Sequence, residues 1–405
     1  MKRFLVILFV LFGGLVLVGC DDSKKELKTV SMFGGTDANV EVYQERIGKF
    51  EEETGFKVKD NSSTSDEEWK SRVIADFKNG NEPDVLQFFT GETAKAFVDE
   101  GLVMSIEDIR KEYPDYAKNI NASVLGTHSV PTTGFVEGIF TNKDHFKSAE
   151  AKAYLEKTSW TWTEFKSLLA ILVEDNKDVE GYKPIAYGID IPHYWIDHLV
   201  AAELGPDYYQ EIVKTGGADK LSGALLKLSE IEQYLSKDNQ EAFSSQAFLD
   251  GKYTFQLDGS WFGGRIELPN VSVYPFPELN STHKTTLLSG FTSGFYITKK
   301  AWDNKYKREA AVKFIENMTS TEALSKFVTK AGGFAADDKA AATNETNLSK
   351  ELRGLIGRVN FTVLPLGDAS KTGTYATLVE AQAAFINNNI ELAKTAATTY
   401  SNDQK

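Results

Sequence analysis

Cysteine is almost absent, because Cys20 is the only one in 405 residues. A lone thiol cannot form a disulfide within the chain, and it cannot supply the several thiolates of a cysteine-based metal site. Thiol catalysis is excluded from the rest of the chain for the same reason. The sequence also lacks G-x-S-x-G, a Walker loop, H-E-x-x-H and G-x-G-x-x-G. It therefore predicts neither an enzyme nor a resident cofactor or metal.

Basic residues are outnumbered: 45 Lys and Arg stand against 58 Asp and Glu, giving a formal net charge of −13. No basic block occurs, which argues against nucleic acid and against electrostatic adhesion to anionic lipid. Carboxylates are so frequent that paired Asp and Glu say nothing for or against a hydrolase. After the apolar run Phe4–Val18 no second long one follows, so we expect a soluble mature body and a monomer.

The N-terminus carries the clearest signal. A basic start precedes Phe4–Val18, which has the length of a signal-peptide core and is short for a membrane span. The run ends in Leu17–Cys20 (LVGC), which resembles a bacterial lipobox. This predicts a lipoprotein signal peptide at 1–19, lipid on Cys20, a polar tether at 20–28 and anchorage in the cell envelope, facing periplasm or exterior. The alternative is an ordinary signal peptide with a chance cysteine.

About 380 mature residues exceed one comfortable core, so two lobes are expected. Alternating periodicity in the first hundred residues predicts βαβαβα, with a parallel, helix-covered sheet. The expected strands are Thr29–Phe33, Phe56–Lys59 and Asp84–Phe89. The expected helices run from Val40 past Phe50 to a Gly55 cap, from a capping box at Ser65–Glu68 to Gly80, and over Glu92–Glu100. Ligands bind beyond the carboxyl ends of such strands.

A second alternating stretch follows, and no flexible linker separates it from the first. The lobes should therefore be joined by strands that cross between them. The expected strands are Gly134–Asn142, Tyr253–Asp258, Val271–Tyr274 and Gly294–Ile297. The expected helices are one through Val173 capped at Thr161, Tyr194–Leu204, Gln240–Leu249, two within 307–330 that part near Thr319–Glu322, Thr374–Asn387 and Ile390–Tyr400.

Seven segments, in order along the chain, resemble motifs of family 1 extracellular solute-binding proteins, the maltose-binding-protein-like receptors of bacterial ABC importers. Thr141 replaces the usual tyrosine of one motif and Phe295 the second glycine of another. Their order and spacing make the match specific. The segments are Ile47–Gly55, Asn81–Val85, Gly138–Phe146, Thr161–Phe165, Asp258–Trp261, Ser293–Ile297, and Arg308–Ile315 followed by Thr319-Ser320.

The resemblance implies an α/β fold of two lobes, each with a mostly parallel sheet flanked by helices, and several crossing segments at a hinge. The first lobe would comprise 28–135 and 276–335, and the second 136–275 and 336–405. A small solute, a mono- or oligosaccharide, would bind in the cleft between the lobes. The closed protein would then dock on the transmembrane permease of the importer.

Aromatic residues are the first candidates for binding, since sugar rings have apolar faces that stack on flat side chains. Trp261 follows a strand-like run, and the resemblance implies that it stands at a position where the family stacks its ligand. Tyr194 and Trp195 are adjacent on a helix, so only one should face the cleft, and Trp195 is preferred. Phe88 and Phe89 alternate on a strand, so one is expected in the core and one at the cleft.

The hydroxyl rim of a sugar needs polar partners. We expect these from Asp37 in the first loop and from Glu137 in the segment that crosses between lobes. Phe334, in a Gly-rich loop, and Tyr375, near the start of a late helix, are further aromatic candidates.

Two rival interpretations stay open. The clamp could bind a phosphate ester, polyamine or metal, and Arg265 keeps the phosphate option open. For a metal, the best segment is Asp190–His198, but its two histidines are five residues apart and diverge on a helix. The other rival is a surface enzyme that acts on glycans.

Overall fold

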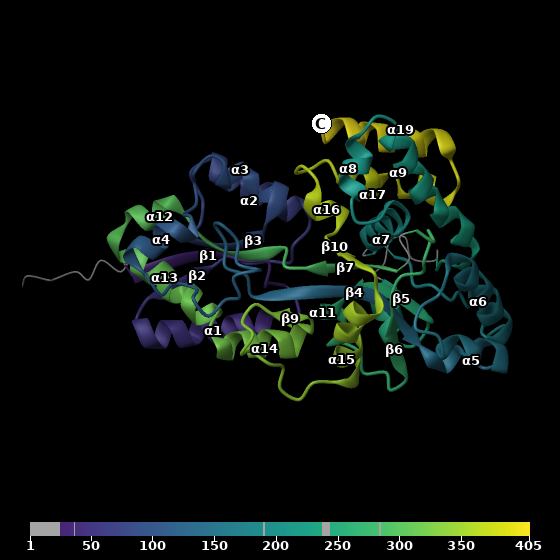
Figure 1. Ribbon diagram of the computed structural model, residues 1–405. Helices are drawn as coiled ribbons and strands as arrows, with labels where there is room; N and C mark the ends of the chain where they lie inside the picture. Colours follow the sequence, from purple (N-terminus) through teal and green to yellow (C-terminus); the bar gives the residue numbers. More distant parts are fainter. Residues whose placement is uncertain (1–24, 36, 189–190, 237–243, 283–284) are drawn as a thin grey trace, which may run out of the picture.

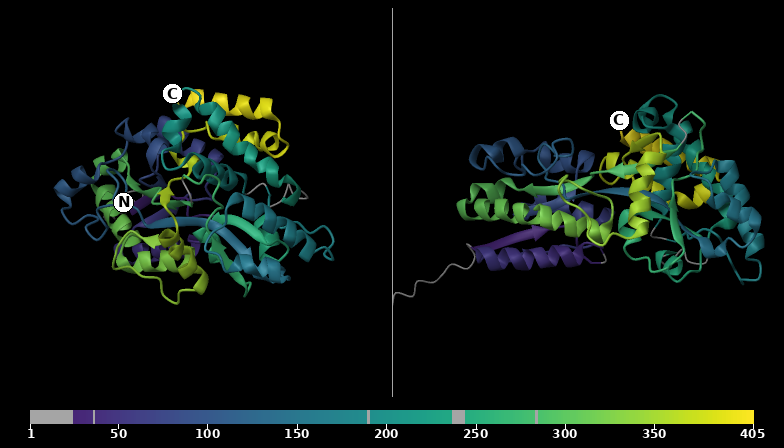
Figure 2. Two further views of the ribbon diagram at one scale, coloured as in Figure 1. Left: turned by 45° about the vertical axis from the view of Figure 1, so that its right-hand side comes forward. Right: turned by 60° about the horizontal axis from the view of Figure 1, so that its bottom comes forward.

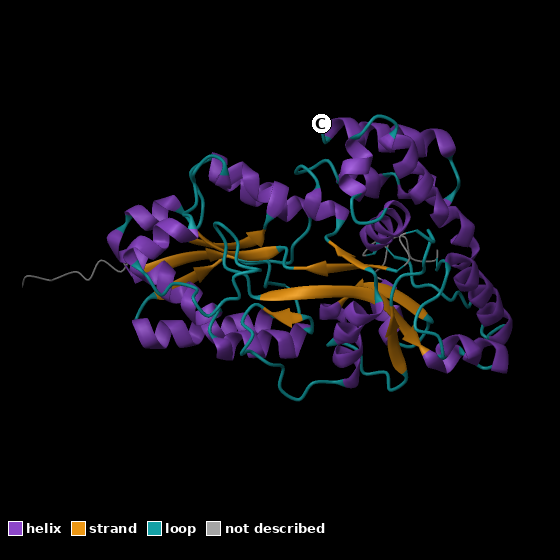
Figure 3. Cartoon of the chain, viewed as in Figure 1, coloured by secondary structure: helices purple, strands orange, loops and turns teal. Residues whose placement is uncertain are grey.

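The computed structural model describes residues 25–35, 37–188, 191–236, 244–282 and 285–405. They form two lobes, each built around a sheet with helices on its faces (Figures 1 and 3). This confirms the predicted two-lobed α/β class. In these ranges no helix is long and apolar enough to cross a membrane. The signal peptide and Cys20 lie outside the described residues, as does the start of the helix expected at Gln240–Leu249.

The first lobe contains a four-stranded sheet in the order β2-β1-β3-β8. Strand β1 pairs in parallel with β2 and β3, as predicted, and β8 pairs antiparallel with β3. The strands are β1 Glu26–Val30, β2 Lys57–Asp60, β3 Val85–Phe89 and β8 Ser293–Ile297. The helices around it are α1 Val40–Thr54, α2 Glu67–Lys78, η2 Gly91–Ala94, α3 Lys95–Val98, α4 Ile106–Glu112, α12 Lys299–Asp303, α13 Lys305–Met318 and α14 Thr321–Ala331.

Two local expectations in this lobe need correction. Strand β1 begins at Glu26, and Leu27 is fully buried in the core. The polar tether therefore ends before residue 28. The N-cap of α2 is Asp66 and not Ser65, since the Asp66 carboxylate accepts the Trp69 N–H at 2.7 Å. By contrast, Gly55 caps α1 in the left-handed conformation as expected, with φ 70°.

The second lobe is organised around β4, Thr133–Asn142. Four strands pair with it, and every one runs antiparallel to it. The expectation of a mostly parallel sheet is therefore wrong for this lobe. The reason is that β4 leads the chain away from the first lobe, and its neighbours run back toward it. These are β5 Phe255–Gly259, β6 Val271–Tyr274, β7 Thr286–Gly290 and β9 Phe334–Ala335, while β10 Phe361–Val363 is parallel to β7.

Helices cover this second sheet, with α19, α9 and α8 gathered at one end of the lobe near the C-terminus (Figures 1 and 2). Helix α6 begins with the capping box expected at Thr161. The helices are η3 Lys143–His145, α5 Ala149–Leu155, α6 Trp162–Asp175, α7 Pro192–Leu204, α8 Tyr208–Val213, α9 Gly217–Leu226, η4 Lys227–Tyr234, α10 Ser244–Leu249, α11 Ser260–Gly263, α15 Asn347–Gly354, η6 Leu355–Arg358, α16 Leu366–Ala369, α17 Ala376–Glu380, α18 Gln382–Ile386 and α19 Ile390–Asp403.

Three crossings between the lobes meet at the start of β4. Thr133 pairs with Ala335 of β9, and Phe135 pairs with Gly290 of β7. Residues 276–290, assigned from the sequence to the first lobe, belong to the second, because β7 is in its sheet and Phe276 is in its core. Residues 336–343 instead pack on the first lobe, where Ala336 is buried. Motif spacing did not reveal these boundaries because they follow from strand pairing.

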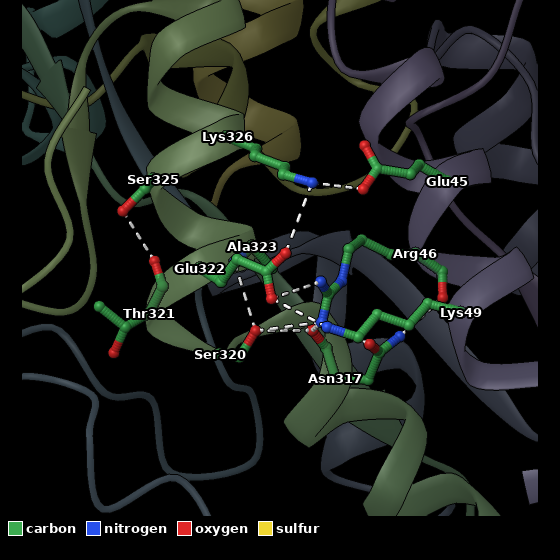
Figure 4. A network of polar contacts seen from close by, with 10 residues as sticks. All are labelled: Glu45, Arg46, Lys49, Asn317, Ser320, Thr321, Glu322, Ala323, Ser325 and Lys326. Atoms are coloured by element: carbon green, nitrogen blue, oxygen red, sulfur yellow. Dashed lines mark hydrogen bonds and ion pairs between the residues drawn. The ribbon is translucent and has the colours of Figure 1, made fainter. Parts of the chain in front are cut away.

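A buried arginine fastens the returning helices α13 and α14 to α1 (Figure 4). Arg46 is 2% exposed and donates to the Asn317 carbonyl at 2.9 Å and to the Ser320 hydroxyl at 3.2 Å. Its guanidinium also lies 3.2 Å from the Glu322 carboxylate. Lys49 contacts the same carboxylate at 2.9 Å, but its side chain is 38% exposed. The two cations therefore contact one anion from very different environments.

We predict that Arg46→Ala lowers the free energy of unfolding by about 2 kcal/mol, because it removes charged hydrogen bonds and leaves buried acceptors unpaired. Lys49→Ala is the matched control and should cost about 0.5 kcal/mol or less, since exposed ion pairs contribute little. Urea denaturation of both variants measures the difference. Equal losses of stability would contradict this account of the junction.

Candidate functional site

Three aromatic side chains from three elements lie together on the second lobe. The ring centroid of Trp261, on α11, is 5.9 Å from that of Phe135 on β4 and 6.3 Å from that of Tyr194 on α7. All three side chains are half-buried, so each keeps some exposed surface. We call Phe135, Tyr194 and Trp261 the aromatic patch. Trp261 was the leading sequence candidate, and Phe135 was missed because nothing in the sequence distinguishes it from a core residue.

The preference for Trp195 over Tyr194 has to be corrected. Helix α7 begins at Pro192, and successive residues on a helix point about 100° apart. Trp195 is 1% exposed and packs on Phe276, with ring centroids 5.6 Å apart. Tyr194 is therefore the residue of this pair that joins the patch. Burial, together with the charges of Asp258 and Glu137, holds the pKa of the Tyr194 hydroxyl well above its ordinary value.

Two of the first-lobe candidates come from the end of β3. Phe88 is fully buried and packs on Trp69, with ring centroids 5.2 Å apart, so it is a core residue. Phe89 is half-buried, and the Lys70 ammonium lies 4.2 Å from its ring centroid. The expected split of the pair into a core residue and an outward one follows the alternation of a strand, and Phe89 stays a candidate.

Asp37 lies at the N-terminal end of α1, also in the first lobe. Its carboxylate accepts the backbone N–H of Asn39 at 2.7 Å, and burial raises its pKa to about 6. The Asn39 side chain is 4% exposed, and its carbonyl oxygen has no hydrogen-bond partner among the described residues. The start of α1 therefore presents a carboxyl group with a raised pKa and a buried amide oxygen without a partner among the described residues.

Glu137 occupies the middle of β4, directly opposite Gly259 of β5. It is 3% exposed, and its Oε2 lies 3.2 Å from Nε2 of His198 on α7. Burial raises the pKa of Glu137 well above its ordinary value, and it lowers the pKa of His198 to about 3. His198 is thus a neutral partner at physiological pH. The role of Glu137 as a polar partner for a sugar hydroxyl therefore stays a prediction, and it would have to be filled by a buried side chain.

Tyr375 precedes α17 and is 5% exposed, so it offers little surface for stacking. Its hydroxyl donates to Oδ1 of Asp197, on α7, at 2.7 Å. Burial, aided by the charge of Asp368, raises the pKa of Asp197 to about 8. Phe334, on β9, is half-buried and packs in the same hydrophobic cluster as Trp261. Tyr375 therefore orients a carboxyl group, while Phe334 packs against the same core cluster as Trp261.

The two lobes touch where η2 of the first meets α16 of the second. A Cβ placed on Gly91 of η2 would lie 3.3 Å from the Asp368 carbonyl oxygen of α16. The charge of Lys70, in the first lobe, also reaches Asp197, in the second, and lowers its pKa. Lys70 was missed in the sequence, because a lysine inside a helix carries no motif, and Asp197 was considered only as part of the metal candidate Asp190–His198.

The described surface of the first lobe has two hollows. One, of about 240 Å³, lies between the end of α1 and the start of α13. The other, of about 320 Å³, lies between η2, α3 and the loop 124–131, close to the crossing at Phe291. Neither is lined by any candidate residue named from the sequence. No group of three or more His, Cys, Asp or Glu residues suited to a metal occurs in the described ranges.

The chain belongs to the family of bacterial extracellular solute-binding proteins, whose profile matches residues 36–324. No curated protein matches the sequence closely enough to count as a relative. Solved structures share the fold. A chitin oligosaccharide binding protein has a TM-score of 0.80 at 16% identity, covering 94% of this chain and 98% of its own. The solute-binding protein RafE in complex with raffinose has 0.72 at 16%, covering 94% and 100%.

A maltotriose binding protein from Thermus thermophilus, bound with maltotriose, has a TM-score of 0.68 at 16% identity, covering 93% of this chain and 99% of its own. At such identities the likeness establishes the fold alone. The class is nevertheless clear, because the family consists of binding proteins that capture small solutes outside the cell.

The protonation of Asp197 gives a test of the buried geometry. Its pKa is about 8 in the folded protein and 3.8 as the ordinary value, so the native state holds an extra proton between them. This group therefore costs stability as the pH rises from about 4 through 8. Asn does not titrate. We therefore predict that, between pH 5 and pH 8, the free energy of unfolding of Asp197→Asn rises relative to that of the wild type by more than about 1 kcal/mol.

Urea denaturation at both pH values measures the difference. The matched control is Asp219→Asn on α9, whose side chain is 75% exposed, and it should leave the pH profile unchanged. Parallel profiles for Asp197→Asn and the wild type would show that Asp197 titrates in an ordinary environment.

Proposed function

We propose that this protein is the solute receptor of an ABC importer, and that it binds a carbohydrate between its lobes. The observation that carries the proposal is the aromatic patch, where Trp261, Tyr194 and Phe135 keep exposed surface at the edge of the second lobe. A pyranose ring needs a flat apolar surface for its face and polar groups for its hydroxyls. The patch supplies the first requirement.

We expect the polar partners to come from both lobes. Asp37 and Lys70 belong to the first lobe, and the Asp197 and Asp258 carboxyls lie near the patch in the second. Ionised carboxylates accept, protonated carboxyl groups also donate, and lysine donates, so the set matches hydroxyl groups, which both donate and accept. Since these residues come from both lobes, closure around a hinge brings them onto one ligand.

Similar structures support a sugar as the solute. They include a chitin oligosaccharide binding protein, complexes with raffinose, stachyose and maltotriose, and a receptor with a preference for β-D-galactopyranose. These ligands range from a monosaccharide to oligosaccharides, so they favour the sugar class without selecting one member. Delivery of the bound solute to a membrane permease completes the proposed role.

Lipid on Cys20 would hold this receptor at the membrane, as a monomer in the cell envelope. The proposal rests on the lipobox-like Leu17–Cys20 and on the small number of residues in the sequence between Cys20 and β1, which begins at Glu26. Few residues then separate the lipid from the first lobe, so the receptor would stay close to its permease.

The test is isothermal titration against chitooligosaccharides, raffinose, maltotriose and galactose. For the sugar that binds, we predict that Trp261→Ala weakens affinity by about 2–3 kcal/mol, or roughly 30- to 150-fold, because stacking and apolar burial are both lost. Tyr306→Ala is the matched control, since Tyr306 is an exposed aromatic of the first lobe, at 58%.

Tyr306→Ala should leave the dissociation constant unchanged. If the wild type binds none of these sugars in titration but does bind a peptide or a metal, the proposed function is wrong. Unchanged affinity in Trp261→Ala would instead remove Trp261 from the site while leaving the class of ligand open.

A further inference from the structure

Gly259 is the last residue of β5 and lies two residues before Trp261. A Cβ built on Gly259 would meet three carbons of the Trp261 six-membered ring, Cζ2, Cη2 and Cε2, at 2.2, 2.3 and 2.4 Å. All three distances are far below van der Waals contact, which for carbon atoms is about 3.5–4.0 Å. The indole therefore occupies the space that any side chain at residue 259 would need.

The three distances also give the orientation of the ring. A Cβ that approached the edge of the ring in its plane would be close to one atom and clearly farther from the two beside it. Nearly equal distances to three consecutive atoms instead place the Cβ over the face of the ring. One face of the Trp261 indole therefore lies on the backbone of Gly259.

The glycine is needed for space, because its backbone conformation is one that any residue adopts. Gly259 has φ −87° and ψ 171°, which is ordinary extended backbone. Gly332 and Gly333 differ, since their positive φ values of 67° and 72° favour glycine for conformational reasons. An alanine at residue 259 would therefore fit its backbone and be opposed by the indole.

We propose that Gly259 is a positioning residue that seats the indole of Trp261 and so sets the depth and tilt of the stacking surface. This inference rests on the proposed function. The face on Gly259 is covered, and the rings of Tyr194 and Phe135 flank the indole at 34° and 47°. We therefore expect a sugar ring to lie flat on the opposite face of the indole.

The contact with Gly259 also sets the position of the indole relative to the buried carboxyl group of Glu137. Glu137 is the cross-strand partner of Gly259, so the two residues share one face of the sheet. A methyl group at residue 259 would lift the ring by roughly 1.5 Å to restore contact distance. The contacts of the indole with Tyr194 and Phe135 would then change, and so would its position relative to Glu137.

The experiment is a double-mutant cycle between Gly259→Ala and Trp261→Ala, with sugar affinity measured by titration and stability by urea unfolding. We expect Gly259→Ala to weaken sugar binding by at least 10-fold in the wild-type background and by less than 2-fold in the Trp261→Ala background. The control is Gly223→Ala on α9, where an added Cβ meets no atom within 4 Å, and it should bind as the wild type does.

Stability gives a second readout that does not depend on any sugar. If the indole is what opposes a methyl group, Trp261→Ala should relieve the clash, so the double variant should be as stable as Trp261→Ala alone. The near-UV circular dichroism contributed by Trp261, obtained by difference from Trp261→Ala, should change in Gly259→Ala. Should Gly259→Ala alone fail to fold, folding of the double variant would support the seat.

The outcomes distinguish a failure of the inference about Gly259 from a failure of the proposed function. Wild-type affinity in Gly259→Ala, or an equal loss in the Trp261→Ala background, would overturn the inference. A double variant that stays less stable than Trp261→Ala would overturn it as well. If the wild type binds no sugar, the proposed function fails, and the stability cycle and the dichroism still decide whether Gly259 seats the indole.

Discussion

The whole arrangement depends on one strand, β4. Its ten residues begin where the lobes meet and end in the core of the second lobe. At its start it hydrogen-bonds to the two other segments that cross, through the pairs Thr133–Ala335 and Phe135–Gly290. At its centre it carries Glu137 opposite Gly259. A shift of register by one residue would therefore misplace the hinge, the buried carboxyl and the stacking surface together.

The candidate site combines the apolar surface of the aromatic patch with buried carboxyl groups. Glu137 and Asp197 are both almost fully buried, and burial raises the pKa of each. His198 does not neutralise Glu137, because burial lowers the His198 pKa to about 3. Carboxyl groups in this state can donate as well as accept hydrogen bonds, which suits a ligand rich in hydroxyl groups. The electrostatics thus fit the neutral, polar solute proposed for the aromatic surface.

Much of the first lobe could be predicted from the sequence, because its order is local. Strands and helices alternate with short connections, and such chains fold into parallel sheets by rule. The Gly55 cap and the Thr161 capping box are likewise signals within a few residues. The antiparallel second sheet was not predictable in this way, since the neighbours of β4 come from positions 255 to 335. Non-local pairing leaves no periodic trace.

The candidate site shows the same division. Trp261 was found through a motif, and the choice between Tyr194 and Trp195 failed because the facing side of α7 is set by packing on Phe276. Gly259 stands inside the same motif. Its contact with the indole arises because the Trp261 side chain turns back onto the backbone two residues earlier, which motif spacing does not reveal. Lys70 and Asp197 come from different lobes and have no shared sequence signal.

The central claim is that a sugar ring lies between the lobes on the free face of the Trp261 indole. The most direct measurement is a crystal structure of the protein with a sugar that binds in titration. The account predicts a pyranose ring stacked on the indole face opposite Gly259, with polar contacts from both lobes. A sugar held in the first-lobe hollow beside the loop 124–131, with the indole uncovered, would contradict it.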